Sequence, residues 1–161
     1  MLYVITGPPA SGKTTYAMAR AKPSDIVIDY DRIAVALAGP GADSHGHDRV
    51  LKRVAHKARF AAIAEALDRL DETDVYLIHS MPAEHNMARY RSLDARVVTL
   101  DPGRQVVEAR CRAERPQLLA VVGKWYAWHA RQQAAPPAAA AAPAPATAPP
   151  GGGARPASRA W

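Results

Sequence analysis

The sequence predicts an α/β fold in which helices cover both faces of a parallel sheet. Two observations indicate it: apolar, β-branched runs recur along the chain, and each is followed by a segment of helical composition. The runs cover residues 2–6, 25–29, 74–79 and 96–100. Strands buried on both faces are apolar throughout, and right-handed crossovers through helices make them parallel. We therefore expect a three-layer sandwich with four or five parallel, buried strands.

Proline and glycine mark the expected ends of the helices. The expected stops are Pro23, the Gly39-Pro40-Gly41 turn and Pro116. The expected helices cover residues 15–21, 33–38, 48–70, 84–93 and 104–114, and a last helix ends near residue 133.

We expect one folded domain over residues 1–133, followed by a disordered tail over residues 134–161. The tail is rich in proline, alanine and glycine, a composition that cannot assemble a core. A linker or solubilising segment is the simplest interpretation. A peptide that ends in Trp161 and docks on a protein partner is the alternative.

Composition indicates the cellular compartment of the protein and the charge of its ligands. Cys111 is the only cysteine, so no disulfide can form within the chain, and a reducing cytoplasm fits. The first residues lack the charged region of a signal peptide, and no apolar run approaches a membrane span. We therefore expect a cytoplasmic protein that does not contact a membrane. The net charge of +6 suits polyanionic ligands.

Residues 7–14 read GPPASGKT, which has the spacing of a Walker A phosphate-binding loop, and they lie between an expected strand and an expected helix. In such a loop, glycines permit unusual backbone angles, and backbone N–H groups with the helix N-terminus cradle a phosphate. Lys13 would reach the β- and γ-phosphates, and the Thr14 hydroxyl would ligate Mg²⁺. We therefore expect ATP or GTP, with Mg²⁺, as ligand. The expected nucleotide-binding residues of this loop are Gly7, Pro8, Pro9, Ala10, Ser11, Gly12, Lys13, Thr14 and Thr15.

The end of the second expected strand carries Asp29, Asp31 and Arg32. A carboxylate here can accept a proton from an attacking hydroxyl or orient that hydroxyl, and an arginine can clamp a substrate phosphate. Helix capping, as an N-cap or first-turn residue, is the alternative role for Asp31. We expect Asp29 to be the functional carboxylate and Asp31 to cap the following helix.

Three segments, GPPASGKTTYA, IVIDYDRIAVAL and RCRAERP, together resemble the P-loop polynucleotide kinases. These are the 5′-hydroxyl kinases of phage nucleic-acid end repair, with relatives among small P-loop kinases and zeta-toxin-like proteins. The resemblance covers about residues 1–130. It implies a P-loop NTPase sandwich with a helical lid, and ATP-dependent transfer to a nucleic-acid 5′ end or a nucleotide-like acceptor. It also implies that Asp29 is the general base and that Arg32 binds the substrate's phosphate.

The resemblance assigns Arg110, Arg112 and Arg115 to a lid whose arginines reach the transferring phosphoryl group. We expect Arg110 and Arg115 to be catalytic and Arg110 and Arg112 to contact the nucleotide, because guanidinium groups stabilise charge on that group. An ordinary solvated helix face with an Arg110–Glu114 pair is the alternative. The third strand departs from the family pattern, because it ends in His79, a poor Mg²⁺ ligand, instead of an aspartate.

The long helix carries a stripe of basic residues at helical spacing: Arg49, Lys52, Arg53, His56 and Lys57. With Phe60 continuing its line, this stripe could track a polynucleotide; an ordinary solvated face is the alternative. The opposite face is expected to pack on the core through Val50, Leu51, Val54, Ala55 and Ala58.

The remaining aromatic, histidine and cysteine residues are not expected to take part in chemistry. The aromatic residues Trp125, Tyr126 and Trp128 are expected to pack the last helix against the sheet. His45, His47 and Asp48 are not expected to form a metal site, and Cys111 is expected to have no chemical role.

Two classes of function fit these residues. The first is a P-loop kinase that transfers the γ-phosphate to a hydroxyl. The second is an NTP-binding or NTP-hydrolysing module, similar to an AAA-like ATPase, that acts with a protein partner through the tail. The Asp29 and Arg32 pair favours the kinase, and the third strand lacks the terminal Asp-Glu that motor ATPases use.

Overall fold

The computed structural model describes residues 1–42 and 46–134. Its sheet has four parallel strands in the order β2-β3-β1-β4. The strands are β1 (Leu2–Thr6), β2 (Ile26–Ile28), β3 (Val75–Ile78) and β4 (Arg96–Thr99). The prediction of a parallel four-stranded α/β fold is confirmed, and the described residues contain no fifth strand.

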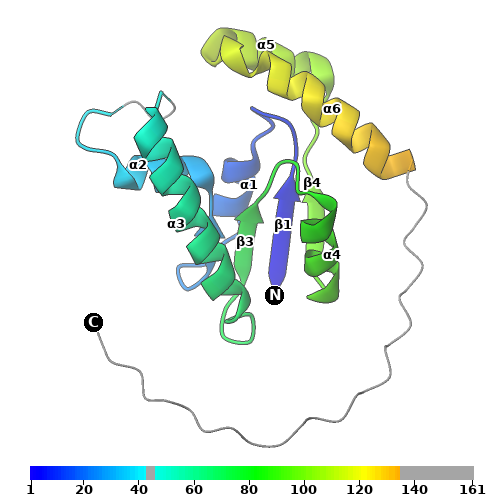
Figure 1. The fold of residues 1–161 in the computed structure, drawn as a ribbon. Coiled ribbons are helices and arrows are strands. Elements are labelled where there is room, and N and C mark those ends of the chain that lie inside the picture. Colours follow the sequence, from blue (N-terminus) through cyan, green and yellow to red (C-terminus); the bar gives the residue numbers. More distant parts are fainter. Residues whose placement is uncertain (43–45, 135–161) are drawn as a thin grey trace, which may run out of the picture.

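Helices separate the strands as the sequence predicts (Figure 1). They are α1 (Lys13–Met18), α2 (Tyr30–Leu37), α3 (Arg49–Leu67), α4 (Glu84–Ser92), α5 (Arg104–Glu114) and α6 (Leu119–Ala134), with the 3₁₀ turn η1 (Pro116–Leu118) before α6. Among the described residues, no helix has both the length and the apolar character needed to cross a membrane.

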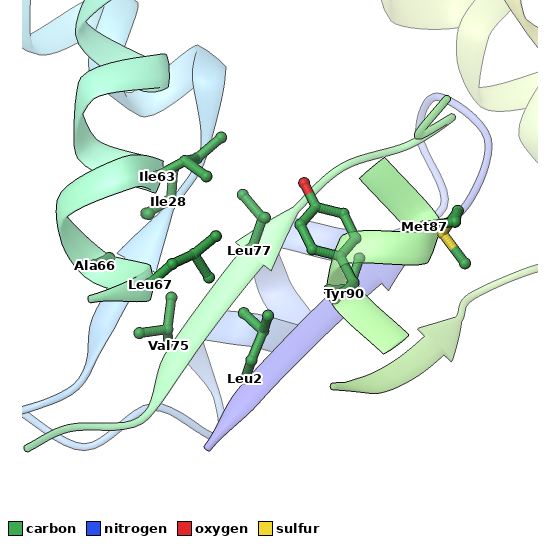
Figure 2. Packing of buried hydrophobic residues seen from close by; sticks show 10 residues of the cluster. Leu2, Ile28, Ile63, Ala66, Leu67, Val75, Leu77, Met87 and Tyr90 are labelled. Atoms are coloured by element: carbon green, nitrogen blue, oxygen red, sulfur yellow. The ribbon is translucent and has the colours of Figure 1, made fainter. Parts of the chain in front are cut away.

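One face of the sheet packs against α3 and α4. Leu2 and Val4 of β1 and Val75 and Leu77 of β3 point to this side, where they form one buried cluster with residues of both helices. Figure 2 shows side chains of α3, including Ile63 and Leu67, and Tyr90 of α4 directed toward these strands. Burying this cluster ties the two helices to the strands whose ends carry the site.

The other face packs against α1. Ile5, Tyr76 and Ile78 alternate with the residues of the first cluster along their strands and bury Ala17 of α1. Tyr3 and Tyr76, opposite each other in the register of β1 and β3, stack with ring centroids 4.7 Å apart. The three layers are therefore α3 with α4, the sheet, and α1.

The expectation of four buried strands is wrong for β4. Val97 is 42% exposed, and Arg96 and Thr99 are exposed as well. β4 lies at the edge of the sheet, and the helix that follows it, α5, packs mainly on α6 and η1 instead of returning to cover it. One edge of the sheet therefore stays open.

The expected role of the last helix also needs correction. Trp125 is fully buried, but α6 packs mainly on α5 and η1 and not on the sheet. A small separate core forms between α5 and α6 from Val107, Cys111 and Val122. Ala10 packs against it; this residue belongs to residues 7–14, which we call the phosphate loop. Trp125 reaches the main domain through its indole N–H, which donates to the Ser80 carbonyl at 3.0 Å.

The expected buried face of α3 is wrong for Val50 and Val54, which are 67% and 50% exposed. The buried positions follow a different line along the helix: Ala55, Arg59, Ile63, Ala66 and Leu67. Ala55 is a predicted core residue, whereas Arg59 is a charged residue at a buried position. The reason for the error is that an arginine occupies the apolar face, which obscures the pattern.

Candidate active site

A cleft of about 1090 Å³ lies beyond the carboxyl ends of β1, β2 and β3. This is where parallel sheets bind ligands. Its walls are the phosphate loop, the first turns of α2, one side of α3, the segment after β3 and the end of α5. The predicted site residues that line it are Pro9, Ala10, Ser11, Gly12, Lys13, Thr14, Thr15, Asp29, Arg32, Arg110 and Arg115.

The phosphate loop depends on its two glycines. Gly7 has φ 149°, and a Cβ there would lie 2.4 Å from the Leu100 carbonyl oxygen and 2.7 Å from Ser11 Oγ. Gly12 has φ 89° and directly precedes α1. Only glycine adopts such angles without strain, and at Gly7 only glycine fits the space. Gly7 and Pro8 shape the loop from beneath and do not line the cleft.

Lys13 is held within this loop. Its ammonium group donates to the Pro8 carbonyl and to Ser11 Oγ. Burial lowers the pKa of Lys13 from 10.5 to about 8, although the Asp29 carboxylate acts in the opposite direction. A phosphate group in the loop would favour the charged ammonium by the same electrostatic effect as Asp29, so the lysine is suited to bind an anion.

The Asp29 carboxylate joins the loop to α2. Its Oδ2 accepts a hydrogen bond from the Thr14 hydroxyl at 2.6 Å, and its Oδ1 accepts one from the Asp31 N–H at 3.1 Å. The side chain is only 5% exposed. Asp29 is therefore the N-cap of α2, and the prediction that Asp31 caps this helix is wrong. The reason is that β2 ends at Ile28, so α2 begins at Tyr30 and not at Ile33.

The oxygen atoms of Thr14 and Asp29 fit a magnesium ion. Mg²⁺ prefers hard oxygen ligands and usually takes only one or two from the protein, with phosphates and waters completing its shell. Within the described residues, no group of three or more His, Cys, Asp or Glu side chains could hold a metal by itself. Asp48 instead caps α3 by accepting from the Leu51 N–H at 2.8 Å, and His45 lies outside the described residues.

Two of the three lid arginines reach the cleft. Arg110 donates to the Ala10 carbonyl of the phosphate loop at 3.1 Å, and Arg115 approaches the Asp31 carboxylate at 3.7 Å. Arg112 is not part of the cleft wall and pairs with Glu108 at 3.0 Å. Arg110 of α5 therefore contacts the phosphate loop, and Arg115, directly after α5, approaches α2.

The Arg32 side chain lies at the open side of the cleft. It is exposed, and its Nη1 donates to the Met18 sulfur at 3.1 Å. No carboxylate among the described residues forms an ion pair with it. Arg32 is therefore available to a ligand but is not held in place by burial.

The cleft is also lined by Arg59 and His79, of which Arg59 was not among the predicted site residues. Arg59 of α3 is 7% exposed and donates from Nη2 to the Ile78 carbonyl at 2.9 Å. The His79 ring nitrogen Nδ1 lies 2.9 Å from the Tyr90 hydroxyl. Burial, with the Arg59 charge second, lowers the pKa of His79 from 6.5 to about 4, so this imidazole is neutral at pH 7. The signal for Arg59 was its place four residues from Ala55 and Ile63, on the apolar face.

An outer groove of about 480 Å³ continues from the cleft along α3. We call it the α3 groove; its lining residues are Arg49, Val50, Arg53, Val54, His56, Lys57 and Phe60. His56 lines both the groove and the cleft. Its ring centroid lies 4.5 Å from that of Tyr30 and 6.4 Å from that of Phe60, so aromatic side chains connect the two hollows.

Comparisons with known proteins add no family to this description. No protein-family model matches the chain, and a search of curated proteins finds no match. A proposal for the function must therefore rest on the residues that line the cleft.

Proposed function

We propose that this protein is a P-loop kinase that transfers the γ-phosphate of ATP, or of GTP, to a hydroxyl acceptor. One observation carries the proposal: the Thr14 hydroxyl of the phosphate loop donates to the buried Asp29 carboxylate, which directly follows β2. A phosphate-binding loop thus shares its cleft with a carboxylate that can serve a hydroxyl nucleophile.

The donor would be held by the phosphate loop. Its backbone N–H groups and the Lys13 ammonium would bind the β- and γ-phosphates, as in other Walker A loops. Mg²⁺, when bound, would neutralise charge on these phosphates, with Thr14 as its protein ligand. A ligating hydroxyl keeps its proton, so Thr14 can still donate to Asp29.

The acceptor would be activated by Asp29. As the acceptor oxygen forms a bond to the γ-phosphorus, the bond from that phosphorus to the bridging oxygen of ADP breaks, and the hydroxyl proton passes to the Asp29 carboxylate. Arg115 and Arg110, which line the same cleft, would stabilise the charge on the transferring group. The resemblance to polynucleotide kinases supports the same roles.

A nucleic-acid 5′ end or a nucleotide-like molecule is the acceptor that we propose. The α3 groove supports it, because basic and aromatic side chains lie together there and the groove joins the cleft at His56. Such surfaces bind single strands by phosphate contacts and base stacking.

A second candidate function is an NTP-hydrolysing module that acts with a protein partner. The exposed apolar residues Val50, Val54 and Phe60 of the α3 groove favour it, since apolar patches often bind proteins. In that case ATP consumption would not depend on a hydroxyl acceptor.

Transfer of labelled γ-phosphate tests the proposal. Wild type and Lys13→Ala would be incubated with ATP, Mg²⁺ and a panel of acceptors: single-stranded RNA and DNA with 5′-hydroxyl ends, nucleosides, nucleotides and sugars. We expect label on at least one nucleic-acid or nucleotide acceptor with wild type and none with the variant. Release of labelled phosphate at the same rate with and without every acceptor would contradict it.

A further inference from the structure

The cleft contains a buried positive charge that the proposed function does not yet use. Arg59 belongs to α3 and lies on its buried face, yet it lines the cleft together with His79, Ser80 and Met81. Only 7% of its surface is exposed. A buried arginine ordinarily has an anionic partner, because removing its charge from water is costly.

The hydrogen bonding of Arg59 is incomplete. Its Nη2 donates to the Ile78 carbonyl at the end of β3, whereas its buried Nε has no hydrogen-bond partner. Within the described part of the chain, no carboxylate lies within the 4.0 Å of an ion pair. Two exposed arginines, by contrast, do have such partners: Arg69 pairs with Glu65 and Arg91 with Glu84.

The groups around Arg59 do not neutralise it. The imidazole of His79 is neutral at pH 7 and is hydrogen-bonded to the Tyr90 hydroxyl. Asp29 is the carboxylate that most affects the Arg59 pKa, but its oxygens already accept from Thr14 and from the Asp31 N–H. The wall of the cleft at Arg59 therefore carries a positive charge that no carboxylate of the described residues pairs with.

We propose that Arg59 anchors a phosphate group of the acceptor, at a second phosphate site that is separate from the phosphate loop. The inference deepens the proposed function and relies on it for the identity of the acceptor. A guanidinium presents a planar fork of donors that matches a phosphate, and a phosphate bound in the cleft would compensate the charge of Arg59.

The position of Arg59 favours the acceptor over the donor. Arg59 is attached to the end of β3, which lies between β1, the strand before the phosphate loop, and β2, which ends at Asp29. The loop and Lys13 already supply donors for the triphosphate. Arg59 is also held by burial, unlike Arg32, the exposed residue to which the family resemblance assigns the substrate's phosphate.

Calorimetry with paired ligands tests the site. The probes are nucleosides and the matching nucleoside 3′- and 5′-monophosphates, titrated with ADP and Mg²⁺ present at saturation. We expect wild type to bind at least one monophosphate about tenfold or more tightly than its nucleoside, the ratio typical of a hydrogen bond to a charged group. Arg59→Gln should abolish this preference, while affinity for ATP, titrated without ADP, changes less than about twofold.

Matched variants separate this site from other roles. Arg69→Gln, an exposed arginine just after the same helix that lines neither the cleft nor the α3 groove, should keep the preference. Arg59→Lys, which keeps the charge without the fork, should retain part of it. A preference that survives in Arg59→Gln, or that wild type lacks, contradicts the proposal. An equal loss of ATP affinity would assign Arg59 to the donor instead. Thermal melting checks that each variant folds. If Arg59→Gln does not fold, the phosphate preference of Arg59→Lys tests the proposed site instead.

The inference and the proposed function can fail separately. Binding of the monophosphate without any phosphoryl transfer would sustain the site and reject the kinase. Transfer to an acceptor with no effect of its phosphate would sustain the kinase and reject the site.

Discussion

The two sides of the cleft are built in different ways. The side where we propose that the donor binds is one continuous segment, β1, the phosphate loop and α1, in which Gly7 and Gly12 set the backbone angles. The side where we propose that the acceptor binds is assembled from the ends of β2 and β3, from α3 and from the end of α5, through side chains far apart in the sequence. The comparison teaches that the first side is a local property of the chain, whereas the second is a property of the packing.

The largest expected effect separates chemistry from binding. Asp29→Asn should lower phosphoryl transfer by about 10²–10⁴, the usual contribution of a general base, while ATP still binds. Asparagine is as good an N-cap as aspartate, so α2 should keep its start and the melting temperature should change little.

Asp31→Asn is the matched control, because Asp31 is the nearby carboxylate of the first turn of α2 and faces Arg115. It should reduce transfer much less than Asp29→Asn. Transfer rates and melting curves of the two variants, measured in parallel, show which of the two carboxylates phosphoryl transfer requires. An inactive Asp31→Asn beside an active Asp29→Asn would reverse the two roles.

Lys13→Ala should affect the donor side next most strongly. Losing a charged hydrogen-bond donor to phosphate should weaken ATP binding by about 10- to 150-fold. The variant should remain folded, because the lysine's partners are a loop carbonyl and the Ser11 hydroxyl and not core residues. Calorimetry with ATP measures this, with Lys22→Ala as a control outside the cleft; equal affinities of wild type and Lys13→Ala would contradict the donor site.

The α3 groove should contribute a salt-dependent part of acceptor binding. If Arg49, Arg53 and Lys57 of this groove each contact a phosphate, they should add about −2 to the slope of log affinity against log salt for a single strand. Replacing these residues with glutamine should make the slope less steep by about the same amount. Fluorescence anisotropy of a labelled single-stranded oligonucleotide measures it, and an unchanged slope would indicate that the groove serves another partner, such as a protein.

Protonation of His79 should affect stability at low pH. Its folded-state pKa of about 4 lies below the unfolded value of 6.5, so the unfolded chain binds a proton first as pH falls. The stability that the neutral His79 side chain contributes to the folded state is fully present above pH 6.5 and is lost as the pH falls from 6.5 to 4. Melting temperature should therefore fall less over this interval for His79→Gln than for wild type; parallel curves would show that His79 does not titrate as described.

The smallest effect should come from the tail. A chain truncated after Ala134 should keep its nucleotide affinity and melt within about 5 °C of the full chain, the shift that roughly 1 kcal/mol produces in a domain of this size. A larger drop would show that residues 135–161 pack on the domain.

The sequence was most informative where structure is local. The β1–loop–α1 unit could be predicted because each of its residues acts through its own backbone or its neighbours. The error at α2 had the opposite cause: the role of Asp29 depends on where β2 ends and on a hydrogen bond to Thr14, in a distant segment. Arg59 lies four residues from both Ala55 and Ile63, but a charge in a basic stretch indicates a solvated position, and packing alone establishes that this residue faces inward.

The same reasoning explains the lid. The α5 bounds agree with the sequence prediction, since composition and Pro116 define them. The packing of α6 on α5 was not foreseen, because apolar periodicity shows which face of a helix is buried but not what covers it. Glu108 and Arg112 have the same i,i+4 spacing as Arg110 and Glu114, so spacing alone did not show which arginine would form an ion pair.

The stoichiometry of ATP consumption tests the central claim most directly. Wild type would be incubated with ATP, Mg²⁺ and the best acceptor of the panel, and ADP, free phosphate and phosphorylated acceptor would be measured together. The account predicts one phosphorylated acceptor for each ADP, little free phosphate, and loss of both products in Asp29→Asn. ADP accompanied by an equal amount of free phosphate, with the acceptor unmodified, would contradict it and identify the protein as a hydrolase.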